Sequence, residues 1–279
     1  MKKIDIPRML QEIPDAPQQL YLRGDLPSPD DYIFLAIVGS RKYSTYGKQV
    51  CKRIIKELSG HPFVIVSGLA LGIDSLAHTA ALEHGLLCCA VPGSGLGDQV
   101  LYPSSNRKLA QQILDAGGCL LSEFEADFTA TAWSFPKRNR IMAGLCHAVL
   151  VIEAENISGT RITARLATEY NREVFAVPGS IFSTQSEGCH RLIQEGAYPT
   201  TSGKNILDYF GLREPSSEEK ILELSDIEQQ IVSLLGSEKS RSEIQEKLGI
   251  STSELSIQLS RLEIRGLIVE RLGKVYKNF

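Results

Sequence analysis

The residues best suited to chemistry in this 279-residue sequence are cations that lie beside small residues. Arg41 follows Gly39 and Ser40, and the run Phe135-Pro136-Lys137-Arg138-Asn139-Arg140 places three cations and an amide where a helix is expected to begin. Helix starts prefer acidic residues because the helix dipole is positive there, so cations weaken such a start unless an anion joins them. Guanidinium groups favour phosphate or carboxylate partners. The pattern predicts an anion site; the alternatives are a solvated surface role for Arg41 and a structural loop contact for Asn139.

Two other loops could present backbone N–H groups to the same ligand. Ser67-Gly68 ends a second apolar run, and Ser158-Gly159 stands between another apolar run and a predicted helix. Glycine lets a ligand approach the backbone closely, and the free N–H groups of a helix start attract anions. Ser158-Gly159-Thr160 is also a good helix cap, so capping alone is the alternative.

Aromatic residues near these loops could stack nucleic-acid bases. They are Tyr102, Trp133 and Phe135, and core packing is the alternative for each. Asp74 and His78 stand four residues apart on a predicted helix, where a hydrogen-bonded structural pair is favoured over a catalytic dyad. No Ser/His/Asp or Cys/His constellation has support from spacing, so we predict no catalytic residues.

The elements that must position these residues alternate between strands and helices. The predicted strands are 33–38, 63–66, 86–91, 119–121, 148–152 and 174–177, and the predicted helices are 45–58, 73–84, 104–116, 135–145, 160–171 and 190–195. Such alternation predicts βαβ units and a Rossmann-like α/β fold, a parallel sheet with helices on both faces. In an open parallel sheet, the loops that follow the strands meet at one edge, where ligands bind.

The pattern divides the chain into four segments. Residues 1–32 are rich in proline and polar groups and predict a lead-in that packs on the core domain, which spans 33–211. Residues 212–220 are polar, contain Pro215, and predict a linker. Residues 221–279 predict three short helices and a hairpin, the pattern of a small winged-helix domain. Its third helix carries acidic as well as basic residues, so duplex DNA and a protein are equal candidates for its partner.

Composition and charge exclude several classes of function. Net charge is −3, so any site for a polyanion must be a local patch. Six cysteines form no C-x-x-C pair and five histidines show no zinc spacing, which predicts reduced core thiols and no metal. The amino terminus has no apolar signal region and the apolar runs are too short to span a bilayer, so we expect a cytoplasmic protein without membrane contact.

The glycine string Gly93-Ser94-Gly95-Leu96-Gly97 invites a dinucleotide-binding interpretation. That fingerprint needs a glycine at position 98, which is Asp98, and no helix follows at once. We therefore predict a flexible rim loop and no cofactor.

Together these segments resemble the bacterial DNA-processing protein A family, also called DprA or Smf. The resemblance spans residues 7–211 and rests on segments in family order: 36–41 (AIVGSR), 66–74 (VSGLALGID) with Ala77-His78, Tyr102-Pro103 with Asn106, 121–123 (LSE), 135–140 (FPKRNR), Ser158-Gly159 with Thr163-Ala164, Val177-Pro178-Gly179, and Leu192-Ile193 with Gly196-Ala197. Each segment alone is weak, but the joint match is highly specific.

The resemblance implies a non-enzymatic protein that binds single-stranded DNA in a basic pocket, protects incoming strands and helps load RecA recombinase during natural transformation. It also implies a homodimer and a carboxy-terminal winged helix. The residues that match the family's pocket motifs and backbone loops are Gly39, Ser40, Arg41, Ser67, Gly68, Phe135, Lys137, Arg138, Asn139, Arg140, Ser158 and Gly159. In this interpretation the four cations neutralise phosphates and Phe135 stacks a base.

The sequence departs from the family pattern at some positions. The amino-terminal helical domain of many members is missing, and the usual Gly-Leu-Asp before Tyr-Pro is one residue longer here, Gly95-Leu96-Gly97-Asp98. An asparagine often found before the Leu-Ile pair is replaced near His190. These departures affect loop detail rather than the fold.

A hydrolase of nucleoside monophosphates is the alternative function, because related Rossmann-like enzymes resemble this chain in the first loops and a mononucleotide would suit Arg41. Those enzymes usually carry a Pro-Gly-Gly-x-Gly-Thr-x-x-Glu motif. The nearest stretches, 91–95 (VPGSG) and 157–161 (ISGTR), lack its second glycine in place and its glutamate.

Overall fold

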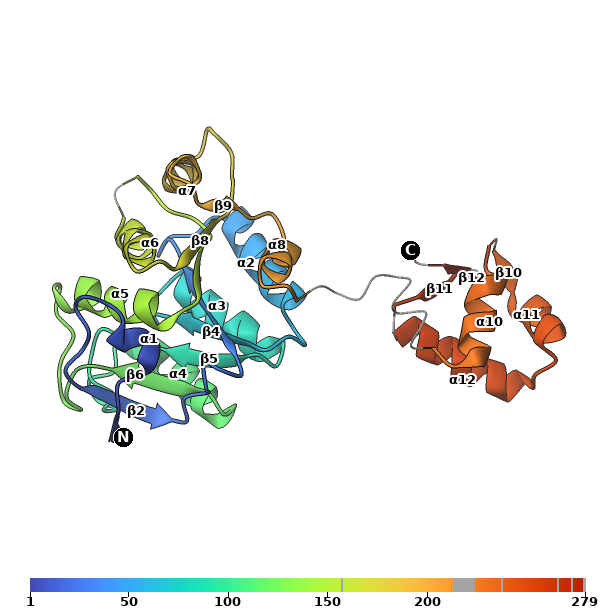
Figure 1. Ribbon diagram of the computed structural model, residues 1–279, viewed down its shortest axis with the longest axis horizontal. Coiled ribbons are helices and arrows are strands. Elements are labelled where there is room, and N and C mark those ends of the chain that lie inside the picture. Colours follow the sequence, from blue (N-terminus) through green and yellow to red (C-terminus); the bar gives the residue numbers. More distant parts are fainter. Residues whose placement is uncertain (157, 213–223, 237, 265, 272, 278–279) are drawn as a thin grey trace. The chain divides into compact units, whose positions relative to one another are not determined.

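The computed structural model describes residues 1–156, 158–212, 224–236, 238–264, 266–271 and 273–277 (Figure 1). The chain forms two compact units, Met1–Leu212 and Arg213–Phe279. Apart from Leu212, the predicted linker lies outside the described residues. None of the helices in the described ranges has both the length and the apolar composition that a membrane span requires.

The first unit is built on a nine-stranded sheet. Its strands are β1 (Lys2–Ile4), β2 (Leu20–Gly24), β3 (Ile33–Val38), β4 (Phe63–Ser67), β5 (Leu87–Ala90), β6 (Cys119–Ser122), β7 (Ala148–Val151), β8 (Glu173–Ala176) and β9 (Tyr198–Pro199), in the order β1-β2-β6-β5-β4-β3-β7-β8-β9. All pairs from β6 to β9 are parallel. The strands are buried on both faces, as parallel strands covered by helices must be.

The lead-in adds two antiparallel strands, so the complete sheet is mixed. β2 pairs antiparallel with β6, with Tyr21 opposite Ser122, and β1 pairs antiparallel with β2. Leu20 and Leu22 point into one core and Tyr21 into the other, because successive side chains of a strand face opposite ways. Both faces of β2 are therefore buried, which ties the start of the chain to the sheet.

Helices cover both faces of the sheet, as the sequence predicted (Figure 1). One face packs against α2 (Thr45–Glu57), α3 (Ile73–Glu83), α4 (Arg107–Asp115) and α8 (Gly203–Tyr209), and the other against α1 (Arg8–Gln11), α5 (Ser134–Leu145), α6 (Gly159–Glu169) and α7 (Thr184–Gln194). A short 3-10 turn, η1 (Ser104–Asn106), precedes α4. The sequence did not predict α8, and α7 begins six residues earlier than the predicted start at His190. The fold is Rossmann-like.

The second unit contains α10 (Asp226–Leu234), α11 (Arg241–Leu248) and α12 (Thr252–Ile264), with strands β10 (Lys239–Ser240), β11 (Ile268–Arg271) and β12 (Lys274–Lys277). The strands form an antiparallel sheet in the order β10-β12-β11. Capping boxes at Ser225 and Ser240 start the first two helices. The predicted third helix ends at Arg265, which lies outside the described residues.

Candidate functional site

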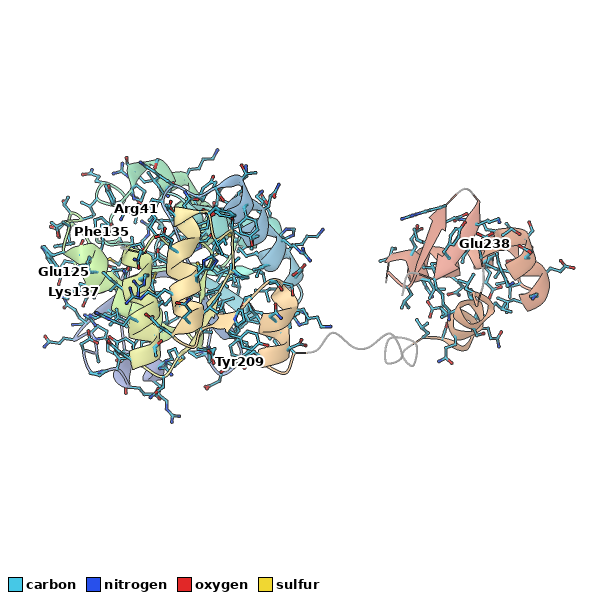
Figure 2. All side chains as sticks on the ribbon, turned by 90° about the horizontal axis from the view of Figure 1, so that it is seen from above. Arg41, Glu125, Phe135, Lys137, Tyr209 and Glu238 are labelled. Carbon is cyan, nitrogen blue, oxygen red and sulfur yellow. The ribbon has the colours of Figure 1, made fainter. Side chains whose placement is uncertain are left out.

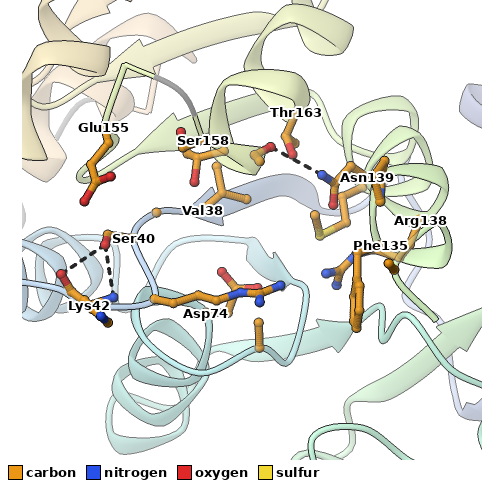
Figure 3. Close-up of a pocket in the computed structure, with 18 residues that line it drawn as sticks. Val38, Ser40, Lys42, Asp74, Phe135, Arg138, Asn139, Glu155, Ser158 and Thr163 are labelled. Atoms are coloured by element: carbon orange, nitrogen blue, oxygen red, sulfur yellow. Dashed lines mark hydrogen bonds between the residues drawn. The ribbon is translucent and has the colours of Figure 1, made fainter. Parts of the chain in front are cut away.

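A pocket of ≈ 720 Å³ opens at the carboxyl ends of β3 and β7. Along the chain, β4, β5 and β6 follow on one side of β3, whereas β7, β8 and β9 follow on the other side. The loops after β3 and β7 therefore diverge and leave a crevice, which is where open parallel sheets bind ligands. The pocket is lined by Val38, Gly39, Ser40, Arg41, Lys42, Ala70, Asp74, Ala132, Phe135, Pro136, Arg138, Asn139, Met142, Glu155, Ser158, Gly159, Thr160 and Thr163 (Figure 3).

Eight of the twelve residues predicted for the site meet at this pocket. They are Gly39, Ser40, Arg41, Phe135, Arg138, Asn139, Ser158 and Gly159. Asn139 also donates a long hydrogen bond from Nδ2 to the Gly159 carbonyl, 3.4 Å away, which joins the start of α6 to α5 (Figure 3). The segments are 39–41, 135–139 and 158–159, so the fold brings three distant parts of the chain to one cavity.

The helical twist of α5 separates the predicted cations onto two faces. Phe135, Arg138, Asn139 and Met142 recur at intervals of three and four residues and line the pocket. Lys137 and Arg140 instead line a second hollow of ≈ 1010 Å³. Of the three cations in this run, Arg138 therefore lines the pocket, and Lys137 and Arg140 line the second hollow.

Arg140 is buried in an ion-pair cluster beside that second hollow. Its Nη2 pairs with Glu123, and its Nε lies 3.6 Å from the Asp15 carboxylate. Lys137 Nζ lies 3.6 Å from the same Glu123 oxygen but keeps 45% of its side chain exposed. Because its guanidinium is committed to two carboxylates, the structure favours a role in the fold for Arg140, and the phosphate role stays a prediction.

Ser67 and Gly68 do not line this pocket, although Gly68 lines a small hollow together with Arg41 and Phe135. Ser67 is fully buried, and its hydroxyl donates to the Ile37 carbonyl at 2.6 Å. A Cβ added at Gly68 would overlap the guanidinium of Arg138. Gly68 therefore leaves room for Arg138, a side chain of the pocket, and its own N–H donates to Asp74.

The base of the pocket holds a buried positive charge. Arg138 donates from Nη1 to the Val91 carbonyl, and its Nε has no hydrogen-bond partner among the described residues. Burial lowers the pKa of Arg138 to about 10, nearby Asp74 opposes that shift, and Arg41 adds to it. Arg138 therefore stays charged at neutral pH, while a second guanidinium lies close enough to repel it.

Asp74 is the carboxylate that faces these cations. It is buried, and its Oδ2 accepts a hydrogen bond from the Gly68 amide at 3.0 Å. Burial raises the pKa of Asp74, and the charge of Arg138 opposes that rise. Neither Arg41 nor Arg138 forms an ion pair with a carboxylate among the described residues. The two guanidiniums are thus available to an external anion.

The starts of α2 and α6 differ in whether a carboxylate of the protein already occupies them. Glu153 is buried behind α2, where it accepts hydrogen bonds from the Ser44 amide (2.9 Å) and hydroxyl (2.5 Å). The positive end of α2 is therefore already matched by a carboxylate of the protein. No spacing signal in the sequence pointed to Glu153, because 109 residues separate it from Ser44.

The start of α6 is open by contrast. Ser158 takes the N-cap position without a capping hydrogen bond, and its hydroxyl has no partner among the described residues. A Cβ added at Gly159 would meet nothing within 4 Å, and the first turn holds no acidic residue. The free N–H groups of this helix start can therefore receive a phosphate.

An aromatic face completes the pocket. The Phe135 ring lies 5.5 Å from the Arg41 guanidinium and 5.6 Å from the Tyr102 ring. Below the pocket, burial lowers the pKa of His78 to about 4, so this imidazole stays neutral at physiological pH, which favours a structural role. Two cations, an open helix start and the half-buried ring of Phe135 suit a ligand that carries both phosphate and a flat base.

Comparison with known proteins agrees with this geometry. The sequence model of DNA recombination-mediator protein A matches residues 1–211. The DNA processing protein DprA of Streptococcus pneumoniae is 46% identical over 203 residues, which is 72% of this chain and 70% of the relative. Protein Smf of Escherichia coli is 39% identical over 274 residues, which is 94% of this chain and 72% of that protein.

Solved structures agree with the sequence matches. The X-ray structure of DprA from Streptococcus pneumoniae has a TM-score of 0.68 at 43% identity, and covers 74% of this chain and 73% of its own. A structure of DNA processing protein A from Helicobacter pylori has a TM-score of 0.67 at 32% identity, and the match covers 75% of this chain and 94% of that protein. That structure concerns the single-stranded DNA binding mode of the Helicobacter pylori protein. The chain belongs to the DNA recombination-mediator protein A family.

Proposed function

We propose that the chain binds single-stranded DNA in the pocket between β3 and β7. The observation that carries the proposal is the convergence of two guanidiniums, Arg41 and Arg138, that lack a carboxylate ion pair among the described residues. The open start of α6 adds backbone N–H donors. Membership of a family in which a relative has a single-stranded DNA binding mode supports the same ligand.

The half-buried ring of Phe135, which lines the pocket, favours a single strand over a duplex. Bases in a duplex hide their faces by stacking on one another, whereas an unpaired base can stack on an aromatic side chain. Arg41 beside this ring would neutralise the phosphate of the stacked nucleotide. Contacts to phosphates and to one ring carry little sequence information, so binding is expected to tolerate many sequences.

The test is binding of fluorescent oligo-dT and of a matching duplex at several salt concentrations. Each phosphate contact contributes about 0.7 to the slope of log affinity against log salt. Arg41→Ala should weaken single-strand binding and reduce the slope by about 0.7. Arg53→Ala, an exposed arginine near the far end of α2, is the matched control and should change neither. A flat salt series, or an unaffected Arg41→Ala, would contradict the proposal.

The family resemblance supports the rest of the proposal. The protein holds incoming single strands in the cytoplasm without reacting with them, helps RecA recombinase to load during natural transformation, and works as a homodimer. RecA filament assembly on oligonucleotides already covered by this protein measures the loading step, and light scattering measures the dimer. Release of ribose from a nucleoside monophosphate would favour the hydrolase instead.

The second unit is proposed to be a winged helix that contacts a protein. The exposed surface of α12, its recognition helix, carries Ile257 and Ile264 beside Arg261. Phosphate-reading surfaces are rich in cations, whereas exposed apolar side chains indicate a protein partner. Ile257→Ser with Ile264→Ser should leave duplex affinity unchanged and abolish a RecA or self-contact measured by pull-down.

A further inference from the structure

We propose that Trp133 and Lys137 form a second nucleotide platform on the face of α5 that points away from the pocket. Trp133 stacks a base of the same single strand, and Lys137 neutralises a neighbouring phosphate. This inference rests on the proposed function and extends the path of the strand beyond Phe135.

Trp133 packs against two stacked aromatic rings. Phe124 and Phe128 stack on each other with ring centroids 4.2 Å apart, and they meet Trp133 edge-on at 5.7 and 5.6 Å. Trp133 nevertheless keeps 54% of its surface exposed. A large aromatic side chain that is fixed by its neighbours yet open to solvent loses little entropy when a base stacks on it.

Lys137 supplies the charge beside this ring. It lies four residues after Trp133, so both side chains occupy one face of the helix start. Its Nζ lies 5.6 Å from the centroids of both Trp133 and Phe124. The adjoining hollow is lined by three cations, Lys3, Lys137 and Arg140, and two carboxylates, Asp15 and Glu123, which leaves a balance of +1. A cation beside an open ring selects a nucleotide over an apolar protein surface.

The platform is continuous with the pocket. Pro136 lines both the pocket and the second hollow, so only the start of α5 separates them. Phe135 and Lys137 lie near each other at the same edge of the first unit (Figure 2). A helix with its side chains is about 10–12 Å across, which a strand leaving Phe135 can cross within a few nucleotides. The occupant is therefore the same strand that fills the pocket.

Trp133 is the single tryptophan of the chain, so its emission reports on this position alone. Oligo-dT of about 4 to about 16 nucleotides, the range of known single-strand site sizes, is added to the full chain while anisotropy of an end label records binding. We expect emission to be quenched only by the longer oligonucleotides, which reach past the pocket. Binding without a change in emission at any length overturns the platform. No binding at all overturns the proposed function as well, so the two failures differ.

Two variants give an independent measurement. Trp133→Ala should weaken binding of the longest oligonucleotide by about 5- to 150-fold, the factor that stacking of one base provides, and leave the shortest unaffected. Lys137→Ala should reduce the salt slope for the longest by about 0.7. Tyr209→Ala, which removes a half-exposed ring on α8, is the control and should change neither. Equal affinity of wild type and Trp133→Ala for the longest oligonucleotide refutes the inference.

Discussion

Gly68 offers the sharpest test of how the pocket is built, because sequence and structure assign it different roles. The sequence predicts a glycine whose backbone cradles the ligand, whereas the structure places the Arg138 guanidinium where a Cβ would lie. Gly68 does not have a positive φ, so alanine fits its backbone and only the overlap with Arg138 opposes the substitution. Gly68→Ala should therefore act through Arg138.

The magnitude follows from that overlap. Inserting a methyl group into a packed site costs about 1–3 kcal/mol, so Gly68→Ala should destabilise the first unit by that amount. Arg138→Gln shortens the side chain and removes the atoms that collide. In that background Gly68→Ala should become neutral or stabilise by about 0.4–1 kcal/mol, because alanine restricts the unfolded chain.

A double-mutant cycle measures this coupling. Urea unfolding gives the free energy of unfolding of the wild type, both single variants and the double variant, and oligo-dT binding is measured on the same four proteins. We expect Gly68→Ala to weaken binding in the wild type and to have little further effect beside Arg138→Gln. An equal loss of affinity in both backgrounds would show that the Gly68 backbone contacts the strand, and would refute the reasoning.

Three further predictions concern the surroundings of the pocket. Arg140→Ala should destabilise the fold by about 3–5 kcal/mol, because it leaves the carboxylate of Glu123 buried without its main partner. Lys137→Ala removes an exposed partner of the same carboxylate and should cost about 0–1 kcal/mol in the same urea assay. Glu153→Ala should cost about 1–3 kcal/mol by leaving the start of α2 without its acceptor; a change in thermal midpoint no larger than that of Arg53→Ala would contradict it. The pKa of His78 is about 4 in the folded protein and ordinarily about 6.5. The unfolded chain therefore takes up a proton first, and the free energy of unfolding, which is at its full value above pH 6.5, falls by roughly 3 kcal/mol as the pH falls toward 4. His78→Gln should flatten that part of a pH series of urea midpoints.

The sequence by itself determined the fold class, because hydrophobic periodicity is a local property. Apolar runs of three to six residues, separated by amphipathic stretches, marked strands β3 to β8 and the helices between them within a few residues. The helix α8 was not predicted because it is only seven residues long and contains few apolar residues. The small β1 and β9 carry no alternation long enough to detect.

The sequence also determined at which edge of the sheet the loops lie. Parallel strands place their carboxyl ends at one edge, so Gly39–Arg41 and Ser158-Gly159 were expected there, and they line one pocket because β3 and β7 are neighbours in the sheet. From α5, Phe135, Arg138 and Asn139 line the same pocket, whereas Lys137 and Arg140 of the same run do not. The position of a residue directly after a predicted strand was therefore enough to predict at which edge of the sheet it lies.

Only the tertiary structure decided what each side chain does. The rotation of α5 about its axis, which depends on how the helix packs on β3 and α6, sends Arg138 into the pocket and Arg140 to Glu123. Glu153, which follows β7, bonds Ser44, which follows the neighbouring β3, and this contact closes the start of α2 while the start of α6 stays open. In the sequence, Arg138 and Arg140 carry the same charge and cannot be told apart. They differ in the fold because Arg140 pairs with the buried Glu123, whereas Arg138 lines the pocket. Desolvation and ion pairing depend on neighbours in three dimensions, which the sequence alone does not give.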